Sequence, residues 1–210
     1  MSNMNASVRR TPVQERSNET VHQILKAASE LLATEPMDQL TTSRVAQAAG
    51  VSVGGLYRFF PDKQSIIDAI AVKHVEDLRV ELEKRLSVEL PQDGSVLLSM
   101  IVDAYMAFLD ERPDFRAIAL GRHVSTLTKN QQASPDVGPA ALVKKFILDR
   151  IGMDAGALDI KIRVASEAGE RLIAYAYEQP LENRSAVIAE MKTMLAGYFF
   201  SVSSSPSPSR

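Results

Sequence analysis

The chain of 210 residues contains no cysteine, so disulfide bonds and thiolate metal sites are excluded. It has no run of about 18 apolar residues, so we expect no segment that crosses a membrane. The first residues, MSNMNASVRRTPVQE, lack the apolar core of a secretory signal. No alternation of apolar and polar residues is long enough to predict a strand. With 45% hydrophobic and 24% charged residues, the composition is that of a globular protein, and its pattern is helical throughout.

Motifs that would indicate an enzyme are incomplete. Residues 50–54, GVSVG, fit the serine-hydrolase pattern G-x-S-x-G, but a helical pattern precedes them where that motif needs a strand. Glu19 and His22 have the Glu-x-x-His spacing of di-iron bundles, which need two such motifs, and His74 and His123 lack the partner glutamate. No Walker-type phosphate loop is present. We therefore expect no catalytic site, no metal site and no cofactor.

The helical periodicity divides the chain into two domains between two polar ends. We expect a disordered arm over 1–15, a first domain over 16–75, a second over 76–200 and a disordered Ser/Pro tail over 201–210. The helix over 62–86 is long enough to leave the first domain and enter the second. Further helices are expected over 17–34, 95–111, from Pro113 onward, and over 140–151, 156–178 and 183–200, with a loop over 128–139.

The most informative segment is 41–63, TTSRVAQAAGVSVGGLYRFFPDK, which predicts a helix-turn-helix. Thr41 and Thr42 are candidate caps for the first of two short helices and Ser52 for the second, because their hydroxyls can accept orphan backbone N–H groups. Gly50 can adopt the left-handed conformation that closes the first helix. Pro61 ends the second helix, whose apolar residues face a core. Two glycines, Gly54 and Gly55, weaken that second helix by about 1 kcal/mol each relative to alanine.

These residues resemble the TetR family of bacterial transcription repressors. The match runs without a gap through the turn, with Phe59 standing where the family usually has His or Tyr. It covers roughly residues 16–75. The residues that match in register are Thr41, Val45, Ala46, Ala49, Gly50, Val51, Ser52, Leu56, Tyr57, Phe60 and Lys63.

The resemblance implies an all-α protein with an N-terminal three-helix DNA-binding domain and a C-terminal helical domain for ligand binding and dimerisation. The net charge is −2, so positive charge for DNA must be local, and segment 41–63 carries three basic side chains against one acidic. Thr42, Ser52, Tyr57 and Lys63 would contact phosphates. Base reading would fall to Ser43, Arg44, Val53, Gly54 and Arg58, and Gly55 completes the expected DNA-binding surface.

The last two helices carry a broad apolar band with small residues that let another helix approach closely. The band is either core of the same chain or one half of a four-helix bundle formed by two chains. The family resemblance favours the homodimer. The expected interface consists of Leu158, Ile162, Ala165, Gly169, Leu172, Met191, Leu195 and Tyr198.

Methionine and aromatic residues in the second domain form either plain core or the wall of a ligand pocket. His123 is either an exposed helix-end residue or a polar anchor within that pocket. The resemblance favours a pocket for a hydrophobic small-molecule effector. Its expected residues are Met100, Tyr105, Met106, Phe108, His123 and Tyr175.

The resemblance implies a cytoplasmic bacterial repressor that binds a pseudo-palindromic operator in double-stranded DNA as a dimer and leaves it when an effector binds. Two alternatives remain at this point. One is a DNA-binding regulator without a ligand, and the other is an all-α enzyme or carrier that uses the helix-turn-helix only as a scaffold.

Overall fold

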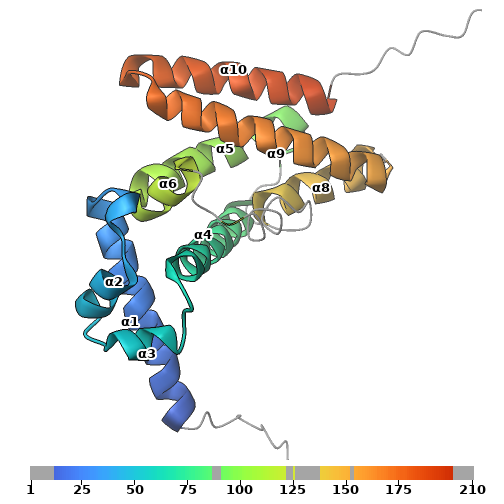
Figure 1. Ribbon diagram of the computed structural model, residues 1–210. Coiled ribbons are helices and arrows are strands. Elements are labelled where there is room, and N and C mark those ends of the chain that lie inside the picture. Colours follow the sequence, from blue (N-terminus) through green and yellow to red (C-terminus); the bar gives the residue numbers. More distant parts are fainter. Residues whose placement is uncertain (1–11, 87–90, 122–124, 126–137, 152–153, 201–210) are drawn as a thin grey trace, which may run out of the picture.

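The structure is a computed structural model that describes residues 12–86, 91–121, 125, 138–151 and 154–200 (Figure 1). Within these residues every regular element is a helix, as the sequence predicts. None of the described helices is both long and apolar enough to cross a bilayer. The elements are α1 (Pro12–Thr34), the 3-10 helix η1 (Met37–Gln39), α2 (Thr42–Ala48), α3 (Val53–Tyr57), α4 (Lys63–Leu86), α5 (Gly94–Glu111), α6 (Pro113–Leu120), α8 (Gly138–Ile151), α9 (Ala155–Glu178) and α10 (Leu181–Phe200).

Helices α1 to α3 and the first half of α4 form a small head at one end of the molecule (Figure 1). Ile24, Val45, Leu56 and Ile66 are fully buried in its core and come from four different helices. Because α2 and α3 are too short to be stable alone, this shared apolar contact is what keeps them folded.

Two boundaries in the head differ from the sequence prediction. Helix α1 begins at Pro12, so residues 12–15 are helical although we expected them in a disordered arm. Proline is compatible with the first turn of a helix, where its missing N–H has no partner to lose. Helix α3 ends at Tyr57, so Phe59 and Phe60 follow it in a turn. The rest of the predicted arm, 1–11, and the predicted tail, 201–210, lie outside the described residues.

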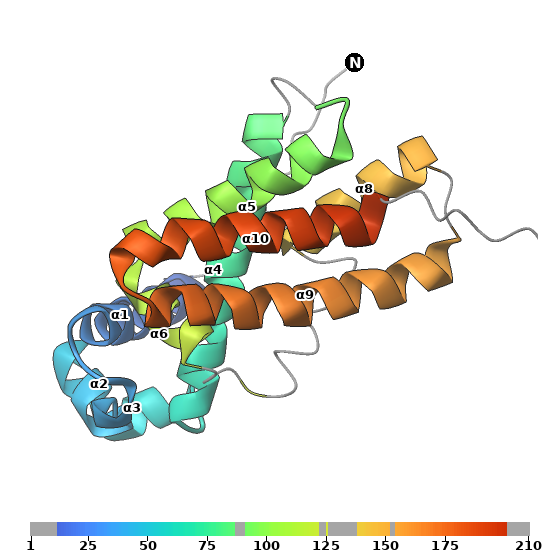
Figure 2. The same cartoon turned by 90° about the horizontal axis from the view of Figure 1, so that it is seen from above.

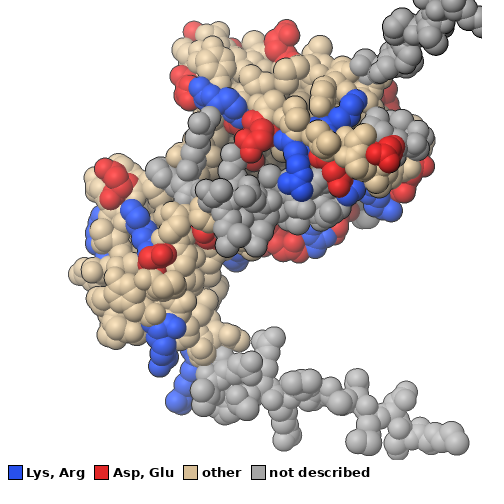
Figure 3. Space-filling model, turned by 45° about the vertical axis from the view of Figure 1, so that its right-hand side comes forward, with Lys and Arg blue, Asp and Glu red and all other residues tan. Residues whose placement is uncertain are grey.

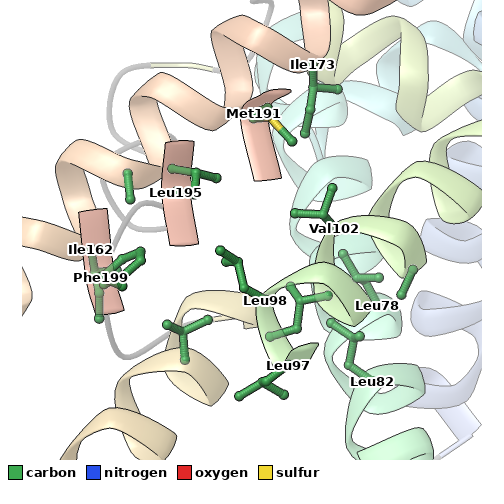
Figure 4. Close-up of a cluster of buried hydrophobic side chains, with 14 of the residues drawn as sticks. Leu78, Leu82, Leu97, Leu98, Val102, Ile162, Ile173, Met191, Leu195 and Phe199 are labelled. Carbon is green, nitrogen blue, oxygen red and sulfur yellow. The ribbon is translucent and has the colours of Figure 1, made fainter. Parts of the chain in front are cut away.

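Helices α5, α6, α8, α9 and α10 build a larger second domain, named the regulatory domain after the role that the resemblance implies, in which α9 and α10 lie side by side as an antiparallel pair (Figure 2). Asp93 caps α5 and Asp154 caps α9 through hydrogen bonds from backbone N–H groups in the first turn. The helix from Pro113 ends at Leu120, and most of the predicted loop over 128–139 lies outside the described residues. The core of this domain joins α4, α5, α6, α8, α9 and α10 (Figure 4).

Two helices belong to both cores. Helix α4 contributes Ile66 and Ile70 to the head and Leu78 and Leu82 to the regulatory domain. Helix α6 does the same within one turn, because Phe115 packs in the regulatory core while Ile118 packs in the core of the head. The head is therefore attached through continuous apolar packing and not through a flexible linker.

Candidate nucleic-acid interface and internal cavity

Helices α2 and α3 are each held at their start by a side-chain cap, as the sequence predicts. Thr41 Oγ1 accepts a hydrogen bond from the backbone N–H of Arg44 at 3.3 Å. Ser52 Oγ accepts one from the N–H of Gly55 at 3.0 Å. Between the helices Gly50 has φ +67°, a left-handed conformation that side chains disfavour. These local interactions fix the angle between two helices that have few hydrogen bonds of their own.

The side of α3 that points away from the core is open. Val53 is 41% exposed and Tyr57 is 49% exposed, although both are large apolar or aromatic side chains. The Tyr57 hydroxyl lies 3.0 Å from Thr42 Oγ1, so α2 and α3 present adjacent polar groups on one surface. The predicted DNA-binding residues that are exposed or half-buried in the head are Thr42, Ser43, Arg44, Ser52, Val53, Gly54, Gly55, Tyr57, Arg58 and Lys63.

The charges near this surface are few. Figure 3 shows Lys and Arg side chains at the lower end of the head beside a broad uncharged area. Lys63 is the first residue of α4 and is half-buried. The N–H of Ser65, in the same turn, already donates to Asp62 Oδ1 at 2.7 Å. A phosphate at this point would therefore meet the Lys63 side chain more readily than a row of unpaired N–H groups.

Arg44 is placed differently from the other predicted base-reading residues. Its guanidinium donates to the carbonyl of Gln39 at 3.0 Å and to the Glu35 carboxylate at 2.6 Å. In this position the side chain ties α2 to the end of α1, and it would have to break both interactions to reach a base. Arg58 remains exposed, with its guanidinium carbon 4.9 Å from the centre of the Phe59 ring.

A pocket of about 380 Å³, partly open to the surface and called the cavity below, lies between the helices of the regulatory domain. Its volume falls near the lower end of the range of small-molecule sites, roughly 300–1,000 Å³. The wall is mostly aliphatic, and Figure 4 shows many of the side chains around it. Residues that line it include Val75 and Leu78 of α4, Leu98, Val102 and Tyr105 of α5, Phe115 and Ala119 of α6, Val143 of α8, Ile162 of α9, and Met191 and Phe199 of α10.

Of the six residues predicted for a ligand pocket, only Tyr105 is among the described residues that line this cavity. Phe108 is packed inside the core, and Met106 faces a separate hollow between α5 and α10. Met100 and Tyr175 are exposed on the outside of their helices, and His123 lies outside the described residues. The methionine and aromatic content pointed to the part of the chain that contains the cavity. It could not show which side chains of each helix face that cavity.

The residues predicted for the dimer interface are mostly occupied within the chain. Leu158 is buried in the core, and Leu172 is half-buried against it. An added Cβ at Gly169 would lie 3.9 Å from Leu195 Cδ1, so the small residues of α9 accommodate α10 of the same chain. Tyr198 is exposed. The residues of this group that line the cavity are Ile162, Ala165, Gly169, Met191 and Leu195.

A different face of α9 and α10 carries exposed apolar side chains. Ile160 is 66% exposed and Val164 is 52% exposed, and Tyr175 lies on the same side of α9 by helical spacing. Met194 and Tyr198, one turn apart, are exposed on α10. Tyr198 was predicted for the dimer interface and Tyr175 for the pocket, whereas Ile160, Val164 and Met194 were not among the predicted site residues, because both faces of α9 contain apolar residues.

At the joint between the two cores, a buried polar pair connects α4 to α6. His74 Nε2 lies 2.8 Å from Asp114 Oδ2, and both side chains are buried. Burial raises the pKa of Asp114, but the hydrogen bond and charge of His74, with smaller contributions from the Phe115 backbone and the Ser29 side chain, hold that pKa below its ordinary value. The Ser29 contribution comes from α1, so this pair joins three helices at the point where the head meets the regulatory domain.

Two family descriptions match the chain. "Bacterial regulatory proteins, tetR family" covers residues 24–70, and "Tetracyclin repressor-like, C-terminal domain" covers residues 95–202, which is more than half of the chain. The chain belongs to the TetR family. The second match extends the resemblance seen in the helix-turn-helix to the regulatory domain.

Curated relatives of this TetR-family protein match over part of their length. It is 28% identical over 100 residues to the nucleoid occlusion factor SlmA of Marinomonas sp. (strain MWYL1), covering 47% of this chain and 49% of the relative. It is 30% identical over 105 residues to the SlmA of Glaesserella parasuis serovar 5 (strain SH0165), covering 49% of this chain and 50% of the relative. The match thus spans about half the length of these relatives.

Solved structures of the family resemble the whole architecture. A TetR-family transcriptional regulator from Streptomyces coelicolor has a TM-score of 0.67 at 25% identity, covering 85% of this chain and 96% of that one. RolR in complex with resorcinol has a TM-score of 0.66 at 16% identity, covering 93% and 98%. At that identity RolR supports the fold alone. In the described residues no cluster of acidic, His or Cys side chains could hold a metal ion.

Proposed function

We propose that this TetR-family regulator is a cytoplasmic repressor that binds a pseudo-palindromic operator as a homodimer and is released by a small apolar effector. The observation that carries the proposal is that helices α4 and α6 each belong to both hydrophobic cores of the chain. Each contributes to the core around the exposed α3 and to the wall of the cavity. A ligand in the cavity therefore touches the same helices that hold the DNA-binding head.

In DNA binding, the open side of α3 would enter the major groove. The first turns of α2 and α4 would contact the phosphate backbone of the DNA. Tyr57 and Lys63 would contact phosphates, and Val53 would meet a base edge such as a thymine methyl. Because the head offers few basic groups, one head alone would bind weakly, and two heads on one operator would add their contacts.

The dimer would form through the outer stripe of Ile160, Val164 and Tyr175 on α9 with Met194 and Tyr198 on α10. These side chains are exposed and largely apolar, and they lie on two helices that pack side by side, which favours a partner over water at this surface. The inner band predicted from sequence is already used by the chain's own core. We therefore move the proposed interface to the opposite side of the same two helices.

Release would proceed through α6. Phe115 and Ala119 line the cavity, Ile118 packs in the head, and Asp114 is bonded to His74 of α4. A ligand that displaces Phe115 would shift α6 and, through the His74 pair, change the position of α4. The ligand can act only if it prefers a conformer whose heads no longer match the two half-sites.

The DNA proposal is tested with Tyr57→Ala and Lys63→Ala. We expect each to weaken operator binding by about tenfold or more, since each removes phosphate contacts on both heads of a dimer. Lys84→Ala is the matched control, because it removes a basic side chain from the last turn of the same helix, far along the chain from the head. Fluorescence anisotropy with labelled operator gives the affinities. Wild-type affinity in both head variants would refute the assignment of the DNA-binding face.

The dimer proposal has its own matched pair of variants. Val164 and Val80 are both 52% exposed, but only Val164 lies on the outer stripe. We expect Val164→Asp to produce monomers in analytical ultracentrifugation, because it buries a charge in the apolar interface, whereas Val80→Asp stays dimeric. A dimer of unchanged stability in Val164→Asp would place the interface elsewhere.

A further inference from the structure

The cavity contains one polar group whose bonding is incomplete. Tyr105 lines the cavity from α5, and its ring is braced edge-on by Phe115, with ring centres 6.4 Å apart. Its hydroxyl makes no hydrogen bond to any residue that the structure describes, whereas the Tyr177 hydroxyl donates to Asp110 at 2.7 Å. A ligand that shuts this hydroxyl off from water must accept its hydrogen bond, or else leave the hydroxyl unsatisfied at a cost in affinity. Its partner is therefore to be sought in the molecule that fills the cavity.

Tyr105 can act only as a neutral hydroxyl. Burial, followed by the Glu170 carboxylate and Tyr177, raises the pKa of Tyr105 well above its ordinary value. The O–H proton therefore stays in place at physiological pH and can be donated to an acceptor. Ser166 carries a second lining hydroxyl, but a helical serine can satisfy itself by bonding a carbonyl of its own helix, which a tyrosine on α5 cannot do.

The charged side chains around the cavity are already paired. Arg171 is bonded to Glu178 at 3.0 Å, and Glu167 and Glu170 each have an interaction partner. A charged ligand would enter a mostly aliphatic space without a spare counter-charge, and burying an unpaired charge is far more costly than burying a neutral polar group. An anion would in addition meet the two carboxylates.

We propose that the effector is an uncharged, largely apolar molecule of small size that carries a hydrogen-bond acceptor, such as a carbonyl oxygen, for the Tyr105 hydroxyl. Its apolar part fills the space between α4, α5 and α10. This inference rests on the proposed function only in naming the ligand an effector, because the binding itself is measured without DNA.

The test uses three probes with one phenylalkyl body and different end groups: benzylacetone (a neutral ketone), hydrocinnamate (an anion) and phenylpropylamine (a cation). Isothermal titration calorimetry on the full chain should show benzylacetone binding at least about tenfold more tightly than either charged probe. Tyr105→Phe, which removes only the hydroxyl, should weaken benzylacetone about fivefold, the value of one net hydrogen bond. Tyr177→Phe is the control, because its hydroxyl already donates to Asp110 and Tyr177 is not among the described residues that line the cavity.

Equal or tighter binding of a charged probe would overturn the proposed ligand class. Unchanged benzylacetone affinity in Tyr105→Phe would overturn the role of the hydroxyl. Absence of binding by all three probes would overturn the assignment of the cavity as a site for such ligands. Each of these results is independent of operator binding by the wild-type protein, so failure here is distinguishable from failure of the DNA-binding proposal.

Discussion

The DNA-binding head and the regulatory domain are both built of helices, but they are specified by different kinds of interaction. In the head, Thr41, Gly50 and Ser52 fix short helices through contacts with residues a few positions away. In the regulatory domain the decisive contacts join residues far apart, such as Gly169 against Leu195. Local chemistry is visible in one sequence, whereas the pairing of distant helix faces is not.

The contrast between the head and the regulatory domain is tested most strongly at the residues where the two pack against each other. Ile118 lies on α6, next to cavity-lining residues, yet it is fully buried in the core of the head. Ile118→Ala should lower the free energy of unfolding by about 2–5 kcal/mol, because it leaves a cavity where both regions meet. Urea unfolding followed by circular dichroism measures this in a chain that has no tryptophan. The matched control is Val96→Ala at an exposed apolar position, and a loss as small as in that control would show that the two regions are not packed together.

A smaller effect is expected from Asp114→Asn at the buried pair. Losing the charge-assisted interaction with His74 should lower the free energy of unfolding by about 1–3 kcal/mol at neutral pH. Because the folded-state pKa of Asp114 is below its ordinary value of 3.8, its stabilising contribution is present above that pH and is lost as the pH falls through the folded pKa. The difference between wild type and variant should therefore shrink in acid.

The control for this pair is Asp77→Asn, which removes an exposed carboxylate from a pair with Lys73 on the same helix. Its effect should be within about 0.5 kcal/mol at any pH. A wild-type-to-variant difference at Asp114 that grew in acid would contradict the sign derived from the lowered pKa.

The smallest change in stability is expected from Gly54→Ala. This substitution should stabilise the fold but weaken DNA binding. An added Cβ would meet nothing within 4 Å, so Gly54→Ala should stabilise the head by up to about 1 kcal/mol. If α3 enters the groove closely at this residue, the same methyl group should weaken operator binding. Gly55→Ala is the contrast, since its Cβ would lie 3.0 Å from Ser52 Oγ and disturb the cap. Tighter operator binding by Gly54→Ala would argue against close approach at this point.

The sequence predicted the helical class, the capped turn and most helix boundaries, because capping residues, glycine and proline act locally. The exposed Tyr57 and the caps at Thr41 and Ser52 lie where the pattern predicted them. The ion pair of Arg44 could not be foreseen, because its partner, Glu35, follows the end of α1 and periodicity does not show which residues meet across two helices. Periodicity identified an apolar face on α9 without identifying the helix that covers it, and in the structure α10 of the same chain packs against part of that face.

The central claim is that two copies of the open α3 surface recognise one operator. Selection of bound sequences from random double-stranded DNA, with the wild-type protein at several salt concentrations, tests it most directly. The account predicts enrichment of a two-fold symmetric site whose halves are spaced by about one helical turn or a multiple of it, with affinity that falls as salt rises. Recovery of no common sequence, or of a single asymmetric half-site bound equally well by a monomer, would contradict it.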